Sequence, residues 1–194
     1  MLKVVHYLNQ FYGGIGGEEK ADIEPQVVPG PVGPGLALQE TFDVVATVIC
    51  GDNFFAENIA EAGQTVLTLI KQFSPDLVLA GPAFNAGRYG VACGEVCKLT
   101  TAVMGIPAVT AMYEENPGVS LYQSDVVIVK AGITARTMKK TVEQMSLVGQ
   151  KLLSNEEITP AADHYFSQGI KKNIVSEYSG AHRAVNMLLA KLQK

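Results

Sequence analysis

The sequence has 194 residues, of which 47% are hydrophobic, and its formal net charge at pH 7 is −4. This length suits one domain, or one and a half, with a sizeable buried core. The acidic balance without a basic run argues against nucleic acid as a partner, because phosphate contacts need clustered Lys and Arg. Three cysteines, an odd number, argue against a disulfide framework, so we expect free thiols.

The first residues predict a strand rather than a secretory signal, because no charged segment is followed by a long apolar core and a small-residue cleavage site. No apolar run of the sequence approaches the roughly 20 residues that span a bilayer. We therefore expect a soluble, cytoplasmic protein that does not contact a membrane.

Patterns of apolar residues predict alternating strands and helices along the chain. Short runs rich in β-branched residues predict five strands, at residues 3–8, 43–49, 76–80, 108–112 and 126–130. Helical spacing predicts helices at residues 36–41, 56–73, 90–104, 135–153 and 180–194. Residues 21–35 contain four prolines, so we expect little regular structure there.

This alternation predicts an α/β fold, namely an open, doubly wound, mainly parallel sheet of about five strands, flavodoxin-like, with a C-terminal helical segment. We assign residues 1–153 to the sheet domain. Residues 154–194 form a polar connector and a C-terminal helix, which we expect to pack on the same domain. In such sheets ligands bind outside the carboxyl ends of the strands.

Polar or glycine-rich clusters follow four of the predicted strands. Because the carboxyl ends of parallel strands meet at one edge of a sheet, we expect these clusters to form one site for a small molecule or a partner protein. The candidate substrate-binding residues are Asn9, Gln10, Gly16, Gly17, Glu18, Asp52, Asn85, Arg88, Glu115 and Asn116.

Residues 81–97 form the most unusual of these clusters, with four glycines and Pro82 where a strand passes into a helix. Glycines let backbone N–H groups approach a ligand closely. Asn85 adds an amide, and Arg88 adds a permanent cation with a planar fork of donors that suits a carboxylate or phosphate. A tight turn with a solvated arginine explains the local pattern equally well. Residues 13–17 lack the spacing of a dinucleotide or Walker motif, which disfavours a nucleotide site there.

The cysteines and histidines give weaker signals. Cys93 and Cys97 share a helix face, but no second Cys/His pair stands at ligand spacing, so core packing is favoured and we predict no metal. Cys50 follows a strand and is the better candidate for an exposed thiol. These three cysteines are candidate redox thiols. His6 lies inside the first strand and is expected to be a core histidine.

Two adjacent carboxylate pairs, Glu18–Glu19 and Glu114–Glu115, would be candidates for general acid–base chemistry if they were buried near Arg88. Solvated surface charges are the commoner state of such pairs. From the residues alone, the chemistry of the site stays open.

Several motifs together resemble the selenoprotein B subunit of glycine, sarcosine and betaine reductases, and this resemblance extends over essentially the whole chain. The motifs are VVHYLNQF at 4–11, GGIGGEEK at 13–20, GPVGPG at 30–35, CGDN at 50–53, the stretch 81–97, ENPG at 115–118 and GAHRAVNMLL at 180–189.

The resemblance implies an oxidoreductase that cleaves a C–N bond reductively in anaerobic amino-acid fermentation. This chain would be the substrate-binding half of protein B, acting on a small amine such as glycine or betaine. Its partners would be a pyruvoyl-bearing subunit, selenoprotein A and the thioredoxin system, in an oligomeric complex. Members of this type are longer than this chain and carry selenocysteine in their second half. We therefore expect no cofactor on this chain, with the pyruvoyl group and selenocysteine on partner chains or a missing half.

Alternative functions stay open at this point. One is a non-catalytic partner-binding or scaffold subunit related to that family, and a weaker one is a metal- or nucleotide-binding flavodoxin-like protein. We expect Arg88 and the glycine-loop N–H groups to hold a substrate carboxylate, the alternative being a structural pair of Arg88 with Glu114 or Glu115. We also expect a second chain to order the long loop at residues 13–35.

Overall fold

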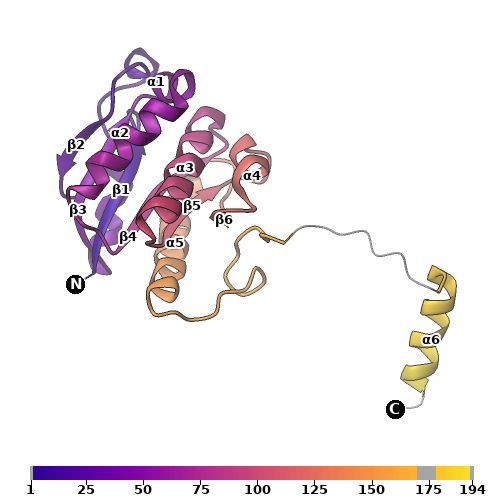
Figure 1. The fold of residues 1–194 in the computed structure, drawn as a ribbon. Helices are drawn as coiled ribbons and strands as arrows, with labels where there is room; N and C mark the ends of the chain where they lie inside the picture. Colours follow the sequence, from indigo (N-terminus) through magenta and orange to yellow (C-terminus); the bar gives the residue numbers. More distant parts are fainter. Residues whose placement is uncertain (1, 170–177, 193–194) are drawn as a thin grey trace.

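The computed structural model describes residues 2–169 and 178–192. Six strands in these ranges form one sheet in the order β2-β3-β1-β4-β5-β6 (Figure 1). The strands are β1 (Lys3–Asn9), β2 (Gln26–Pro29), β3 (Asp43–Cys50), β4 (Leu77–Phe84), β5 (Ala108–Met112) and β6 (Val127–Lys130). Only the β2–β3 pair is antiparallel among these neighbours, so the sheet is mainly parallel, as predicted.

Across the sheet, the five parallel strands stand in the order β3-β1-β4-β5-β6. If these five are numbered as they occur along the chain, the order is 2-1-3-4-5. This is one of the common orders of doubly wound sheets, and the chain reverses direction across the sheet between β1 and β4. The carboxyl ends of these two strands therefore flank the topological switch point. The α/β class is confirmed, whereas the narrower flavodoxin-like assignment stays a prediction.

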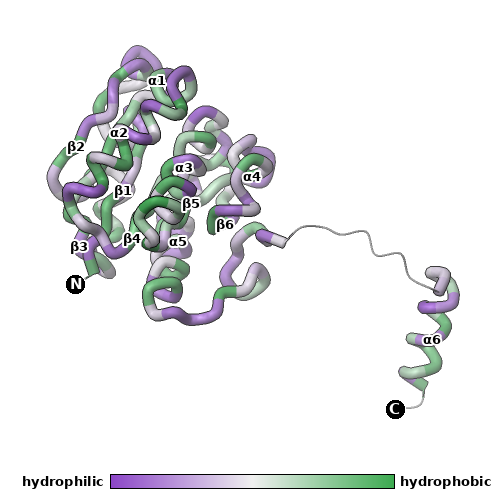
Figure 2. Tube along the Cα trace, viewed as in Figure 1, coloured by the Kyte–Doolittle hydropathy of each residue, from purple (hydrophilic) through white to green (hydrophobic). Residues whose placement is uncertain are grey.

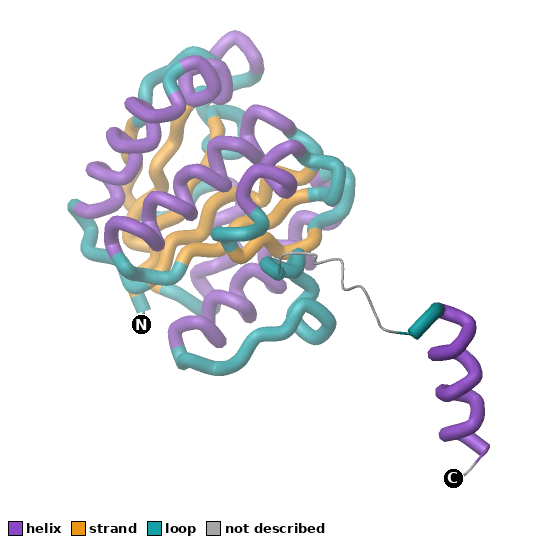
Figure 3. The backbone as a smooth tube through the Cα atoms, turned by 45° about the vertical axis from the view of Figure 1, so that its right-hand side comes forward, coloured by secondary structure: helices purple, strands orange, loops and turns teal. Residues whose placement is uncertain are grey.

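Helices cover both faces of the sheet (Figures 1 and 3). The helices are α1 (Asp52–Glu57), α2 (Ile59–Lys71), α3 (Gly87–Leu99), α4 (Pro117–Tyr122), α5 (Met138–Leu153) and α6 (Gly180–Leu192). Short turns of 3₁₀ helix, η1 (Glu18–Lys20), η2 (Gly33–Glu40) and η4 (Ala135–Thr137), and a π-helical turn, η3 (Thr100–Met104), complete the elements.

Alternation along the strands divides the core into two layers. Val5 and Tyr7 of β1 pack with residues of α1, α2, α3 and α4, whereas Val4 packs with residues of η2 and α5. Both layers are fully closed to solvent at these strand positions. The sheet edge where the strands end is therefore the place where polar side chains can gather.

The structure adds three elements or boundaries that the sequence did not predict. β2 lies within the proline-rich stretch 21–35, at the sheet edge, where Pro29 at its end interrupts no central ladder. β4 continues to Phe84, through the Gly81–Pro82 dipeptide. The predicted helix 56–73 is instead two helices, α1 and α2, that meet at Asn58.

After α5 the chain returns along β6. Val129 forms an isolated antiparallel bridge with Tyr165, and the Lys130 N–H donates to the His164 carbonyl at 2.7 Å. The α6 helix lies away from the α/β body (Figures 1 and 3), and hydrophobic residues recur along it (Figure 2). Its packing on the same domain stays a prediction. Among the described helices, none has the length and apolar character to cross a membrane.

Candidate functional site

Six polar residues meet where β1, β3 and β4 end, at the topological switch point. We call them the switch-point cluster: Asn9, Gln10, Glu18, Asp52, Asn53 and Arg88. The cluster includes five of the predicted site residues, and Asn53 joins them. Their strands are adjacent in the sheet, which brings together residues up to 79 positions apart (88 − 9).

Asp52 is the buried centre of the cluster, with only 8% of its surface exposed. Asn9 Nδ2 donates to Asp52 Oδ2 at 2.9 Å, and the Asp52 N–H donates to Gln10 Oε1 at 3.0 Å. The other carboxylate oxygen, Oδ1, has no hydrogen-bond partner among the described residues. Burial raises the pKa of Asp52, although the Asn9 amide and the Arg88 charge oppose this rise. One buried acceptor is therefore left for a ligand or a solvent molecule.

Arg88 forms the exposed side of the cluster. It donates to Glu18 Oε1 at 2.6 Å and to Asn53 Oδ1. The predicted structural pair of Arg88 with Glu114 or Glu115 is wrong, because the partner is Glu18 of η1. Arg88 and Glu18 are 46% and 68% exposed, so this ion pair adds little stability. Other N–H groups of the guanidinium remain for a carboxylate, since it carries five.

Tyr12 lies beside the cluster and was not predicted as a site residue. Its ring stacks on Tyr89 with 5.9 Å between ring centroids, and its N–H donates to Asn9 Oδ1 at 2.9 Å. Burial and the charge of Asp52 raise the pKa of the Tyr12 hydroxyl. The Phe11–Tyr12 pair after β1 was the available sequence signal, because aromatic residues at a strand end can line a site.

The glycine loop does not offer free donors to a ligand. The N–H groups of residues 13–16 donate to backbone carbonyls of residues 9–11, and the Gly17 N–H donates to Glu19 Oε1 at 2.9 Å. The amides of Gly16 and Gly17 are thus engaged within the loop. A carboxylate at this cluster would rely on Arg88 instead.

The glycines of α3 serve helix packing. A Cβ at Gly90 would lie 2.0 Å from Asn116 Oδ1, and one at Gly94 would lie 2.2 Å from Tyr122 Cδ2. Both positions face α4, so glycine is required for the close approach of α3 and α4. The expectation that these glycines bring backbone toward a ligand is replaced by this packing role.

The remaining predicted residues lie apart from the cluster. Asn116 is buried, where it caps α4 and donates to the carbonyls of Phe84 at 2.9 Å and Ala86 at 3.0 Å. Asn85 and Glu115 are exposed. Glu18, Glu19 and Glu114 are exposed too, so the burial required for acid–base chemistry of the two pairs is not met.

All three cysteines are fully buried. The prediction that Cys50 is exposed is wrong, because the last residue of β3 points into the core layer under α1 and α2. Burial raises the pKa of Cys50 to about 12 and raises the pKa values of Cys93 and Cys97 as well. Protonated thiols of this kind pack as small apolar groups.

His6 is a core histidine, as predicted. Its Nε2 lies 2.6 Å from the Gly81 carbonyl, so we assign the proton to Nε2, and burial lowers its pKa to about 4. Within residues 2–169 and 178–192, no group of three or more His, Cys, Asp and Glu side chains could hold a metal ion.

The loop at residues 13–35 is ordered by the domain itself. β2 pairs with β3, and the N–H groups of Gly51 and Asn53 donate to the carbonyls of Ile23 and Ala21, both at 2.9 Å. Ala21 is fully buried. This packing counts against the expectation that a second chain is needed to order the loop.

Comparison with known proteins gives a consistent match over the whole chain. The family model for glycine/sarcosine/betaine reductase selenoprotein B matches residues 1–194. The chain is 54% identical over 197 residues to the glycine reductase complex component B subunit gamma of Carboxydothermus hydrogenoformans. It is 45% and 40% identical, respectively, to the sarcosine and betaine reductase complex component B subunits beta of Peptoclostridium acidaminophilum.

These three alignments cover 98–99% of this chain but 45% of each relative. The chain therefore spans less than half the length of these three relatives. No solved structure matches the chain.

Proposed function

This chain belongs to the glycine/sarcosine/betaine reductase selenoprotein B family, and we propose that it is the substrate-binding part of a component B. The substrate would be a small amine such as glycine or betaine, whose C–N bond is cleaved reductively by the assembled complex. The relatives are named as components of glycine, sarcosine and betaine reductase complexes, which supports membership of an oxidoreductase complex.

The observation that carries the proposal is the pairing of opposite charges in the switch-point cluster. Glycine, sarcosine and betaine each carry a carboxylate and a cationic nitrogen. Arg88 supplies a guanidinium that suits the carboxylate. Asp52 and Glu18 supply negative charge for the nitrogen, and Asp52 Oδ1 is a buried acceptor without a partner among the described residues.

The role of this chain would be to bind and orient the amine. Its three thiols are buried and protonated, so they are poorly suited to redox chemistry. We propose that the selenocysteine and the pyruvoyl group reside on partner chains, with selenoprotein A and the thioredoxin system as further partners in the cytoplasm. This assignment rests on the family resemblance.

Substitution of Arg88 tests the proposal. A charge-assisted hydrogen bond contributes about 1.5–3 kcal/mol, so Arg88→Ala should weaken glycine or betaine binding by about 10- to 100-fold. Arg88→Lys keeps the charge but loses the planar fork of guanidinium donors. Its affinity for the amine should lie between that of the wild type and that of Arg88→Ala. Calorimetry on the reconstituted complex measures this, with Arg183→Ala as a control because Arg183 is an exposed arginine on α6. Unchanged affinity in an Arg88→Ala protein with a lowered melting temperature would contradict the substrate role.

A non-catalytic partner-binding subunit is the second candidate, and the burial of all three cysteines favours it. In that case the chain would assemble with reductase components yet contribute no substrate affinity. A complex that forms normally and binds glycine equally well with wild-type chain and with Arg88→Ala would support this candidate.

A further inference from the structure

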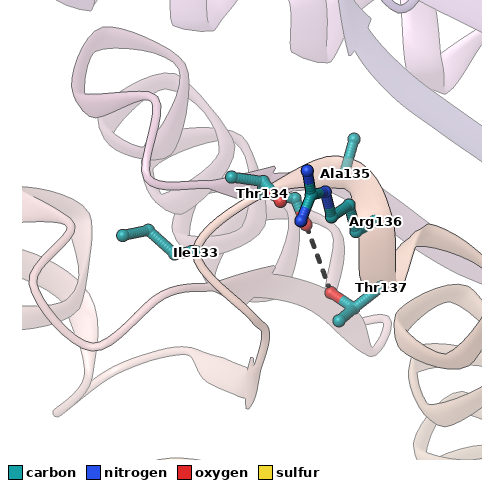
Figure 4. A pocket seen from close by; sticks show the side chains of 5 residues that line it. All are labelled: Ile133, Thr134, Ala135, Arg136 and Thr137. Atoms are coloured by element: carbon teal, nitrogen blue, oxygen red, sulfur yellow. Dashed lines mark hydrogen bonds between the residues drawn. The ribbon is translucent and has the colours of Figure 1, made fainter.

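A second polar site lies at the far end of the same sheet edge, where β6 passes into α5. A cavity of about 360 Å³ opens there, and its charged or polar lining residues are Lys130, Thr137, Lys140, Thr141, Gln144 and His164. No carboxylate lines it. An adjoining cavity of about 680 Å³ shares Thr137 and adds Arg136, whose guanidinium lies beside Thr134 (Figure 4).

The charge of this region differs from that of the chain as a whole. Residues 130–142 contain four basic and no acidic residues, although the chain has a net charge of −4. No single run of the sequence reveals this cluster, because Lys130 and Arg136 stand apart from the adjacent Lys139 and Lys140. Spaced cations can still converge when a strand end and a helix start share one wall.

The cations that line the two cavities form no ion pair with a carboxylate of the described residues. Within the described residues, Lys130, Arg136 and Lys140 have no ion-pair partner, whereas Lys139 pairs with Glu143 at 3.9 Å. Lys130 instead lies over the Phe166 ring, 5.5 Å from its centroid. Cations left unpaired around a cavity attract an anion from solution.

Two acidic groups lie near this region. Glu114, which is exposed, lines a neighbouring cavity of about 230 Å³ together with Lys130. The other, Asp163, precedes His164 in the chain. It is buried and held by Lys151 at 2.5 Å and by the Thr159 N–H at 2.8 Å. Its charge is therefore compensated by Lys151 rather than by the cations of the cavity. The two lysines that line the cavity, Lys130 and Lys140, meet no carboxylate in its lining.

The wall of the cavity is fixed by hydrogen bonds. The Lys130 N–H donates to the His164 carbonyl at 2.7 Å, and Gln144 Nε2 donates to the Asp163 carbonyl at 3.1 Å. His164 has a left-handed backbone, with a φ of 50°, which is uncommon for a residue other than glycine. These contacts hold the His164 segment against β6 and α5, where the cavity forms.

We propose that this cavity binds a small oxyanion with two negative charges, a phosphate or a dicarboxylate. Lys130 and Lys140 hold the anion, with Arg136 at the adjoining opening. The site is separate from the switch-point cluster: three strand spacings, or about 14 Å, lie between β1 and β6. A single molecule of glycine cannot reach both sites.

Titration calorimetry of the full chain at low ionic strength tests the proposal, with inorganic phosphate and malonate as probes. Saturable binding of either anion is expected. The anion that binds more tightly shows whether the ligand is a phosphate or a dicarboxylate. Lys140→Ala should weaken it about tenfold or more. Lys139→Ala is the matched control, because it removes the same charge from a neighbouring residue that does not line the cavity, and it should change the affinity less than about twofold.

Two results would overturn the proposal: no saturable binding of either anion, or equal weakening by Lys139→Ala and Lys140→Ala, which would indicate a general charge effect. Both lysines are exposed, so the variants should fold. Lys130→Ala gives a second test, because Lys130 lines the cavity from β6 and its substitution should also weaken binding of the anion. Binding of glycine or betaine should be unchanged in Lys140→Ala, so the outcome is independent of the Arg88 test.

Discussion

His6 is kept neutral by its position in the middle of β1, where no solvent reaches it. Its pKa falls from 6.5 to about 4 because burial disfavours the imidazolium, although the hydrogen bond to the Gly81 carbonyl opposes the change. Asp52 shows the same effect with the opposite sign, since burial raises the pKa of a carboxyl group. At this scale, burial shifts both pKa values in the direction that favours the neutral form.

The lowered pKa of His6 predicts a stability that depends on pH. The unfolded chain takes up a proton near pH 6.5, whereas the folded chain does so only near pH 4. The contribution of neutral His6 is therefore fully present above pH 6.5 and is lost as the pH falls toward 4. The loss amounts to about 3 kcal/mol of unfolding free energy.

Urea unfolding between neutral pH and pH about 4 measures this loss. His6→Gln is the matched variant, since Gln keeps a donor for the Gly81 carbonyl but does not titrate. We expect a smaller loss of stability on acidification in His6→Gln than in the wild type. The same pH dependence in both proteins would show that other groups cause it.

Asn116 joins three elements at the end of the sheet. Its side chain caps α4 by accepting from the Gly118 N–H at 2.9 Å, and it donates to the two carbonyls between β4 and α3. The missing Cβ of Gly90 makes room for it. The α3–α4 pair and the start of α3, which carries Arg88, therefore depend on this one amide.

Asn116→Ala should lower the free energy of unfolding by about 2–4 kcal/mol, because it removes the cap of α4 and two further hydrogen bonds, to the carbonyls of Phe84 and Ala86. Thermal unfolding measures the effect. Ser120→Ala, on the exposed side of the same helix, serves as the control and should change stability by no more than about 0.5 kcal/mol. If both variants lost a similar amount of stability, the proposed structural role of Asn116 would be contradicted.

The described part of the molecule consists of the α/β body and the α6 helix, whose apolar face is exposed. Val185, Leu188 and Leu192 are 53%, 62% and 82% exposed, at positions that share a helix face. Because these side chains are exposed, the double substitution Leu188→Asp and Leu192→Asp should leave the melting temperature of the body unchanged. Scanning calorimetry compares this variant with Val148→Ala in the buried face of α5, which should lower the melting temperature. A clearly lower melting temperature of the α6 variant would show that the helix packs on the body, as the sequence predicted.

The sequence by itself determined the α/β class, the positions of five strands and the burial of His6. These features follow from local periodicity, because alternating β-branched runs and helical spacing bury one face wherever the elements are placed. The residues at the strand ends were also identifiable, since parallel strands bring their carboxyl ends to one edge. Neither inference requires knowing which strands are neighbours.

Only the tertiary structure decided which side chains meet. The choice of Glu18 as the partner of Arg88, 70 residues away, depends on the order of strands in the sheet and on the path of the loop before β2. The direction of Cys50 into the core depends on the register of β3, and the packing role of Gly90 depends on α4. Such contacts join segments distant in the chain, so no local pattern contains them, and their geometry is fixed only when the layers pack together.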